Sequence, residues 1–164
     1  MTQEKFVHND PDSFHGKKLT LHDCIADKVS FTNNILRFNL PQGLWVTPHH
    51  TDNDYNKILR TDAAAVDFAV KDIDDISVRV FTRSKWPLSQ KIYVEDWHIE
   101  QLLVAINNGR CTIEFITQYR SHFEQLWYCV IHSSKKPYYK ECHLHLPDAD
   151  ATFHWNNLRQ ECEW

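Results

Sequence analysis

CIADKVSF (24–31), TNN (32–34) and ILRFNL (35–40) form the stretch that decides the fold of this chain. Apolar residues alternate with polar ones on both sides of the central turn. Before the turn, the apolar residues Ile25, Val29 and Phe31 all have odd numbers and so would face one side of a strand. After it, Leu36, Phe38 and Leu40 alternate in the same way. Such alternation around an Asn-rich turn is typical of a half-buried β-hairpin. The stretch predicts an architecture and indicates no reaction.

The segments after this hairpin predict more strands and one helix. Strand-like patterns occupy residues 63–70, 76–82, 111–119, 126–132, 141–146 and 151–156. Residues 95–108 instead carry apolar side chains at helical spacing, namely Ile99, Leu102, Leu103 and Ile106. Because the strands come in runs around a single helix, the sequence predicts an α+β fold. We expect a largely antiparallel sheet of about seven or eight strands with this main helix packed on it.

Length and composition predict one domain. A chain of 164 residues with 42% apolar and 13% aromatic content can form one sizeable core, so residues 1–164 are expected to fold together. The polar residues 1–16 are expected to be poorly ordered or loosely packed. They contain no apolar core of a signal peptide, and no later run reaches the roughly 20 apolar residues of a membrane span. We therefore expect a cytoplasmic protein that does not bind membranes.

Composition excludes several classes of function. The three glycines, Gly16, Gly43 and Gly109, cannot form a phosphate-binding loop or the nucleophile elbow of a hydrolase. Residues 51–75 hold seven Asp against three basic residues, a local balance of 3 − 7 = −4. Nucleic-acid binding needs the opposite charge, so we expect none. The five cysteines lack a CxxC pair and are expected to be thiols, with Cys111, Cys129 and Cys142 in the core.

The acidic stretch provides the first candidate binding site. Asp72, Asp74 and Asp75 crowd a short connection between two predicted strands, and Trp86 follows soon after. An acidic loop beside an aromatic anchor matches the rim and centre of a protein interface, and it would attract a partner with a basic surface. The alternative is a solvated surface loop without a partner.

Histidines provide the second candidate site. His143 and His145 alternate on a predicted strand, so both imidazoles would share one face, and His154 or His132 would supply a third ligand. Such a trio would hold a divalent metal that activates water. The alternative is that these histidines are ordinary surface residues and that the protein has no cofactor. No catalytic Cys–His pair is predicted, because neighbours such as Cys142 and His143 face opposite sides of a strand.

The start of the hairpin carries a resemblance. Leu21, His22, Asp23 and Ile25 lead into the L-x-F strand of Leu36 and Phe38, and FHWNNL occupies residues 153–158. About a quarter of the chain thereby resembles small uncharacterised bacterial domains, some of them similar to immunity proteins of bacterial toxin systems. The resemblance implies a bacterial protein that neutralises or regulates another protein, and it transfers no catalytic residue. His22 and Asp23 are expected to bond to nearby backbone groups.

Taken together, these features predict a non-catalytic protein-binding module of the immunity or regulatory type, with an unknown partner and an unknown oligomeric state. The alternative is a metal-dependent enzyme that uses His143 and His145. A third class, a self-assembling structural domain, would be indicated by an obligate dimer in solution.

Overall fold

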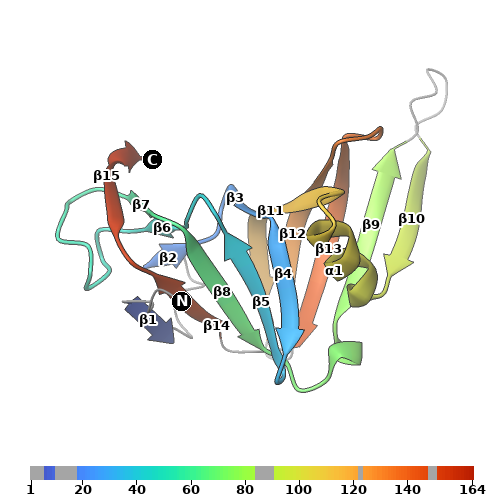
Figure 1. Ribbon diagram of the computed structural model, residues 1–164, viewed down its shortest axis with the longest axis horizontal. Helices are drawn as coiled ribbons and strands as arrows, with labels where there is room; N and C mark the ends of the chain where they lie inside the picture. The colour runs from blue at the N-terminus through green and yellow to red at the C-terminus, as the bar shows by residue number, and fades with distance from the viewer. Residues whose placement is uncertain (1–5, 10–17, 84–90, 122–123, 148–150) are drawn as a thin grey trace.

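The protein folds into three antiparallel sheets and one α-helix, as the computed structural model describes it for residues 6–9, 18–83, 91–121, 124–147 and 151–164 (Figure 1). The five-stranded sheet has the order β1 (Phe6–Asn9), β14 (Ala151–Trp155), β8 (Ala64–Ala69), β5 (Ile35–Leu40) and β4 (Lys28–Thr32). The six-stranded sheet has the order β10 (Ile92–Trp97), β9 (Ser77–Arg83), β13 (Tyr139–Pro147), β12 (Glu124–Ser133), β11 (Cys111–Arg120) and β3 (Cys24–Ala26). The third sheet, here called the end sheet, has four strands in the order β15 (Leu158–Glu163), β7 (Leu59–Thr61), β6 (Trp45–Val46) and β2 (Leu19–Thr20).

The predicted α+β class with antiparallel sheets is confirmed, whereas the predicted number of strands is wrong. Fifteen strands in three sheets occupy the described residues, where about seven or eight were expected. Three of the missed strands, β2, β6 and β7, have only two or three residues. A segment that short cannot show the alternation from which strands are predicted.

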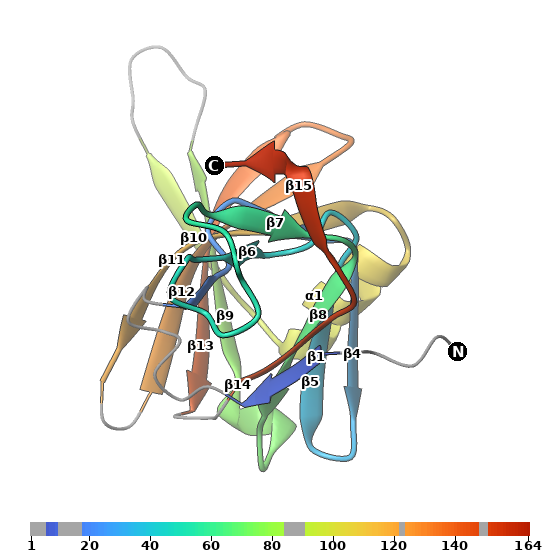
Figure 2. The same ribbon diagram turned by 90° about the vertical axis from the view of Figure 1, so that its left-hand side faces the viewer.

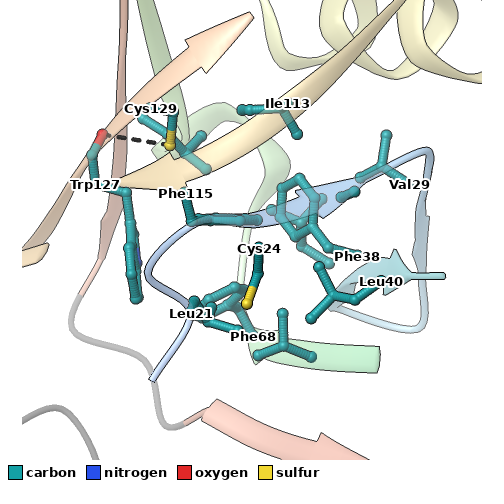
Figure 3. Packing of buried hydrophobic residues seen from close by; sticks show 14 of the residues in the cluster. Leu21, Cys24, Val29, Phe38, Leu40, Phe68, Ile113, Phe115, Trp127 and Cys129 are labelled. Carbon is teal, nitrogen blue, oxygen red and sulfur yellow. Dashed lines mark hydrogen bonds between the residues drawn. The ribbon is translucent and has the colours of Figure 1, made fainter. Parts of the chain in front are cut away.

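The core lies between the five-stranded and the six-stranded sheets. Phe38 of the first sheet packs edge-on against Phe115 of the second, with ring centroids 5.2 Å apart, and Phe68 packs against Trp127 at 6.2 Å (Figure 3). Cys24, Cys129 and Cys142 are buried here as thiols. Burial raises the pKa of Cys24 and of Cys142 to about 12, because a thiolate would lose its solvation. The prediction that Cys111, Cys129 and Cys142 lie in the core is confirmed, because all three are buried, and Cys24 is buried with them.

The stretch 24–40 forms strands, but it does not form one simple hairpin. Its first segment is divided at Asp27: β3 pairs with β11 of the six-stranded sheet, and β4 pairs with β5 of the five-stranded sheet. The predicted parity holds for Val29, which is buried, and for Phe31, which packs against the core, but it is wrong at Ile25, because Cys24 and Ala26 are the buried residues of β3. The tight turn between β4 and β5 is confirmed. Asn33 and Asn34 both have positive φ, at 53° and 62°, as a type I′ turn requires.

The helix α1 (Ile99–Asn107) is shorter than the predicted 95–108. Residues 95–97 extend β10, because their backbone pairs with β9 as far as Trp97 and Asp96 forms an ion pair with Arg79 at 2.8 Å. The helix then begins after His98, whose N–H donates to the side chain of Gln101. Its predicted stripe is confirmed, because Ile99, Leu102 and Ile106 are all buried. It ends at Asn108 and Gly109, and Gly109 has a φ of 66°.

The helix closes one edge of the five-stranded sheet. The side-chain amide of Asn107 donates from Nδ2 to the carbonyl of Val29 at 2.7 Å, and its Oδ1 accepts from the Val29 N–H at 3.1 Å. A side-chain amide offers the same donor and acceptor as a peptide group. Asn107 therefore satisfies the outer backbone groups of Val29 in the edge strand β4, as a neighbouring strand would.

The end sheet covers one end of the sandwich (Figure 2). A stack of rings and a tight turn lie next to its strands. Trp164 stacks on His22 with centroids 5.3 Å apart and contacts Trp45 at 5.4 Å. Gly43 enters this sheet with a φ of 82°, and a Cβ there would lie 2.2 Å from the carbonyl oxygen of Asp62. Only glycine fits this turn.

No helix of the described residues is long and apolar enough to cross a membrane.

Candidate functional site

The face of the six-stranded sheet that points away from the five-stranded sheet, here called the outer face, carries His143 and His145, two of the predicted site residues. Side chains alternate along β13. Cys142, Leu144 and Leu146 point into the core and are buried, whereas His143 and His145 lie on the outer face and are half-buried. The prediction that the two histidines share the wetter face of a strand is confirmed.

A hollow lies on the outer face near the turn between β12 and β13. Its volume is about 470 Å³, and apolar and aromatic side chains form most of its wall: Phe81, Tyr128, Val130, Pro137, Tyr138 and Tyr139. We call this group the tyrosine hollow. Tyr138 is 45% exposed and Tyr139 69% exposed. Arg83 and Glu141, which also line the hollow, are paired at 2.6 Å. The hollow thus combines large exposed rings with a polar rim.

His143 lies next to this hollow between two of its rings. Its imidazole is 4.6 Å from the ring of Phe81 and 5.7 Å from that of Tyr128, measured between centroids. Burial lowers the pKa of His143 below its ordinary value, and the neighbouring charges of His145 and Arg79 lower it further, against the opposing effect of Glu141. His143 is therefore held mainly in its neutral form near neutral pH.

The predicted trio of metal ligands is not brought together. His143 and His145 are neighbours, with ring centroids 6.5 Å apart, but His154 belongs to β14 in the five-stranded sheet. There its Nε2 lies 3.0 Å from Asp67. The other candidate, His132, lies 2.6 Å from Glu114. No group of three or more His, Cys, Asp or Glu side chains within the described ranges is placed to hold a metal ion.

The acidic loop lies at the other end of the same outer face. Asp72 caps the short 3-10 helix η2 (Ile73–Asp75) by accepting from the Asp74 N–H at 3.0 Å, and the three Asp side chains are exposed. None of them forms an ion pair with another residue in the described part of the chain. Trp86 lies outside the described residues.

The acidic loop and the histidines, predicted as two separate sites, meet in the structure. Asp75, Glu124 and His145 line one shallow hollow of about 410 Å³, and Nδ1 of His145 is 3.7 Å from Glu124. We call this the acidic hollow. It follows that a single surface along β13 runs from the tyrosine hollow past His143 to the acidic hollow.

Sequence reasoning missed the tyrosine hollow. Its signal is the Pro137-Tyr138-Tyr139 sequence between two predicted strands, since adjacent aromatic residues at a turn cannot both point into the core. The other walls are Phe81, from a strand expected to have one wetter face, and Tyr128, from the strand 126–132, which was expected to be apolar on both faces and covered by the helix. Their convergence depends on the pairing of β13 with both β9 and β12, which no local pattern indicates.

His22 and Asp23 lie away from this surface, near the end sheet. Nδ1 of His22 donates to the carbonyl of Ile116 at 2.5 Å, next to the bulge in β11, which confirms the expected bond to backbone for His22. Its Nε2 is 3.5 Å from the carboxylate of Asp23.

No protein-family model, curated protein or solved structure matches this chain. The resemblance to immunity-type bacterial domains stays a prediction.

Proposed function

We propose that this chain is a non-catalytic protein-binding module that docks its partner on the outer face of the six-stranded sheet. The observation that carries the proposal is the tyrosine hollow. Tyrosine is enriched at the centres of protein interfaces, because its ring contributes a large contact area and its hydroxyl a hydrogen bond. Here Tyr138 and Tyr139 are exposed. Phe81 and Tyr128 line the same hollow from β9 and β12, which both pair with β13.

Charge supports a partner with a basic surface. The exposed carboxylates of Asp72, Asp74 and Asp75 have no cationic partner among the described residues, and they lie at the end of the face that bears the hollow. Uncompensated charge at the rim of an interface raises the association rate more than it raises affinity. Neutralisation of a bacterial toxin, the role implied by the resemblance, is the narrower form of this proposal.

The metal-dependent alternative gains no observation that favours it. His143 and His145 offer two imidazoles, and the described residues near them add only the carboxylates of Glu124 and Asp75 around the acidic hollow. The binding module is therefore the function that we propose.

The test uses two groups of variants and one matched control. A partner is first captured by cross-linking to the immobilised chain in a lysate of the source cells, and its binding kinetics are then measured with the purified pair. Tyr138→Ser with Tyr139→Ser should weaken binding at least tenfold, roughly the loss expected for hot-spot side chains. Tyr119→Ser is the control, because Tyr119 is equally exposed, at 62%, and belongs to the far end of β11.

The second group replaces Asp72, Asp74 and Asp75 by Asn. We expect slower association and a weaker dependence of the association rate on salt, with little change in the dissociation rate. Equal binding by the parent and the double tyrosine variant would contradict the proposal. Unchanged salt dependence in the triple Asn variant would contradict the basic partner alone.

A further inference from the structure

We infer that β10 pairs with β10 of a second copy of this chain, so that two six-stranded sheets join into one continuous sheet. This inference goes beyond the proposed function and uses a different surface: the free edge of the sheet and not its outer face. It rests on an open backbone edge and on the order of the side chains along that edge.

The edge at β10 is open. β10 pairs with β9 along its whole length without a bulge, and none of the described strands pairs with its other side. Ile92, Tyr93 and Val94 are 57%, 55% and 53% exposed, so neither face of the strand is covered there (Figure 1). An edge strand of this kind presents unpaired N–H and C=O groups that fit another strand.

Symmetry limits how two copies of β10 can pair. In an antiparallel ladder, alternate residues direct their backbone groups toward the same neighbour, so residues that face outward must oppose residues that face outward. A two-fold axis between two copies of one strand must then lie midway between the two copies of a single residue, so that this residue stands opposite itself. The exposed part of β10 runs from Ile92 to Asp96. An axis at Glu95 or Asp96 would place that carboxylate opposite its own copy, which is unfavourable, so the candidates are Ile92, Tyr93 and Val94.

An axis at Tyr93 makes the strand self-complementary. The order Lys91, Ile92, Tyr93, Val94, Glu95 then places Lys91 opposite Glu95 of the second copy, Ile92 opposite Val94, and Tyr93 opposite Tyr93. Both ends carry an opposite-charge pair and the middle is apolar throughout, and such cross-strand pairs stabilise a sheet. An axis at Val94 would instead place Ile92 opposite Asp96. An axis at Ile92 would place Lys91 opposite Tyr93.

The first experiment measures mass in solution by sedimentation equilibrium over a range of concentrations. We expect the parent to approach twice the chain mass of 19.5 kDa as concentration rises. Lys91→Glu and Glu95→Lys each turn two attractive pairs into two repulsive ones, so each should weaken the dimer roughly tenfold or more. The double variant should recover dimerisation, and an equimolar mixture of the two single variants should form a heterodimer.

Two outcomes would overturn the inference. One is a parent that stays monomeric at every concentration, in which case any strand that β10 receives belongs to a different protein. The other is a double variant as weak as the single ones, because the proposed register requires the exchange to be silent. Far-UV circular dichroism of each variant establishes that it is folded, which matters for Glu95→Lys because Glu95 accepts from Nε1 of Trp97 at 2.9 Å.

A second experiment tests the register by disulfide formation in a Cys162→Ser background, since the other four native cysteines are buried. Tyr93→Cys should cross-link, because directly opposed residues have Cα atoms about 4.5–5.5 Å apart, within the range of a disulfide. Ile92→Cys is the matched control, since its two copies would stand diagonally, about 7–8 Å apart. Equal or faster cross-linking of Ile92→Cys would overturn the axis at Tyr93.

Discussion

Two edge strands of this molecule, β4 and β10, end their sheets in opposite ways. At β4 the side-chain amide of Asn107 occupies both the N–H and the carbonyl of Val29, so these two backbone groups are not open to another strand. At β10 no described residue does this, and three consecutive apolar side chains are more than half exposed. The helix follows β10 directly in the chain and still blocks only the more distant edge (Figure 1).

The difference teaches that an unpaired edge is not a necessity of this fold. At β4 a single polar side chain at a helix end occupies the backbone groups of one edge residue. Uncovered edges promote unwanted association, so natural sheets usually protect them with charges, proline or a bulge. An edge flanked by Lys91 and Glu95 but apolar between them is suited to one specific pairing.

The largest effect should come from a substitution that destabilises the packing of the helix α1, which separates these two edges. Leu102→Asp would place an unpaired carboxylate on the buried face of α1, which costs about 3–5 kcal/mol, a large part of the stability of a small domain. We expect the variant to unfold or aggregate in thermal melts followed by circular dichroism. Glu100→Gln, on the exposed face of the same helix, should melt like the parent. A Leu102→Asp variant as stable as the parent would contradict the placement of the core.

Opening the closed edge should have the next largest effect. Asn107→Ala removes both hydrogen bonds to Val29 and should lower the free energy of unfolding by about 1–3 kcal/mol, as measured by urea denaturation. It should also convert β4 into a second open edge, so association should increase at high concentration. Asn108→Ala is the control, because Asn108 makes only backbone contacts at the helix end. Equal stability of the two variants would show that the amide does not protect the edge.

Acid should weaken the five-stranded sheet through Asp67. Burial of Asp67 in the five-stranded sheet raises its pKa, but hydrogen bonds from His154 and Arg37 outweigh burial and bring the pKa below the ordinary value. A lowered carboxyl pKa contributes stability above the pKa of the unfolded state, about 3.9, and this contribution is lost as pH falls through the folded-state value. We expect Asp67→Asn to flatten the loss of stability below about pH 4. An Asp67→Asn variant whose stability falls with acid as steeply as that of the parent would contradict this contribution.

The smallest effects should come from the two half-buried histidines on the outer face of the six-stranded sheet. His143→Ala with His145→Ala should leave the melting temperature nearly unchanged, with or without a chelator, because both imidazoles face outward and lack a third metal ligand among the described residues. A chelator-induced fall of several degrees in the parent that the double variant abolishes would establish a bound metal, which stabilises the folded state by mass action.

The sequence predicted the long elements well and the connections between them poorly. The stripe of Leu102 and Ile106 and the positive-φ turn at Asn33 depend on neighbours in the chain, so their patterns are legible. The change of sheet at Asp27 is different, because it depends on β11 lying beside β3, and β11 is distant in the sequence. A local alternation of apolar residues cannot reveal which of two sheets a strand joins.

The candidate site followed the same division. The exposure of His143 and of the three Asp residues could be predicted from alternation and from charge. Their common surface could not, because it arises from the pairing of β13 with β9 and β12. The short strand β10 was assigned in part to the helix, since Glu95 and Asp96 resemble the acidic first turn of a helix. That misassignment hid the open edge.

The chain crossing at Asp27 also determines how the molecule can assemble during refolding. β4 can pair with β5 at once, because a short turn joins them, whereas β3 has no partner until β11 is in place. Both large sheets moreover take strands from the late part of the chain, β13 in one and β14 in the other. Neither half of the sandwich is therefore an independent folding unit. Long-range pairings of this kind slow folding and make the two sheets form and melt as one cooperative transition.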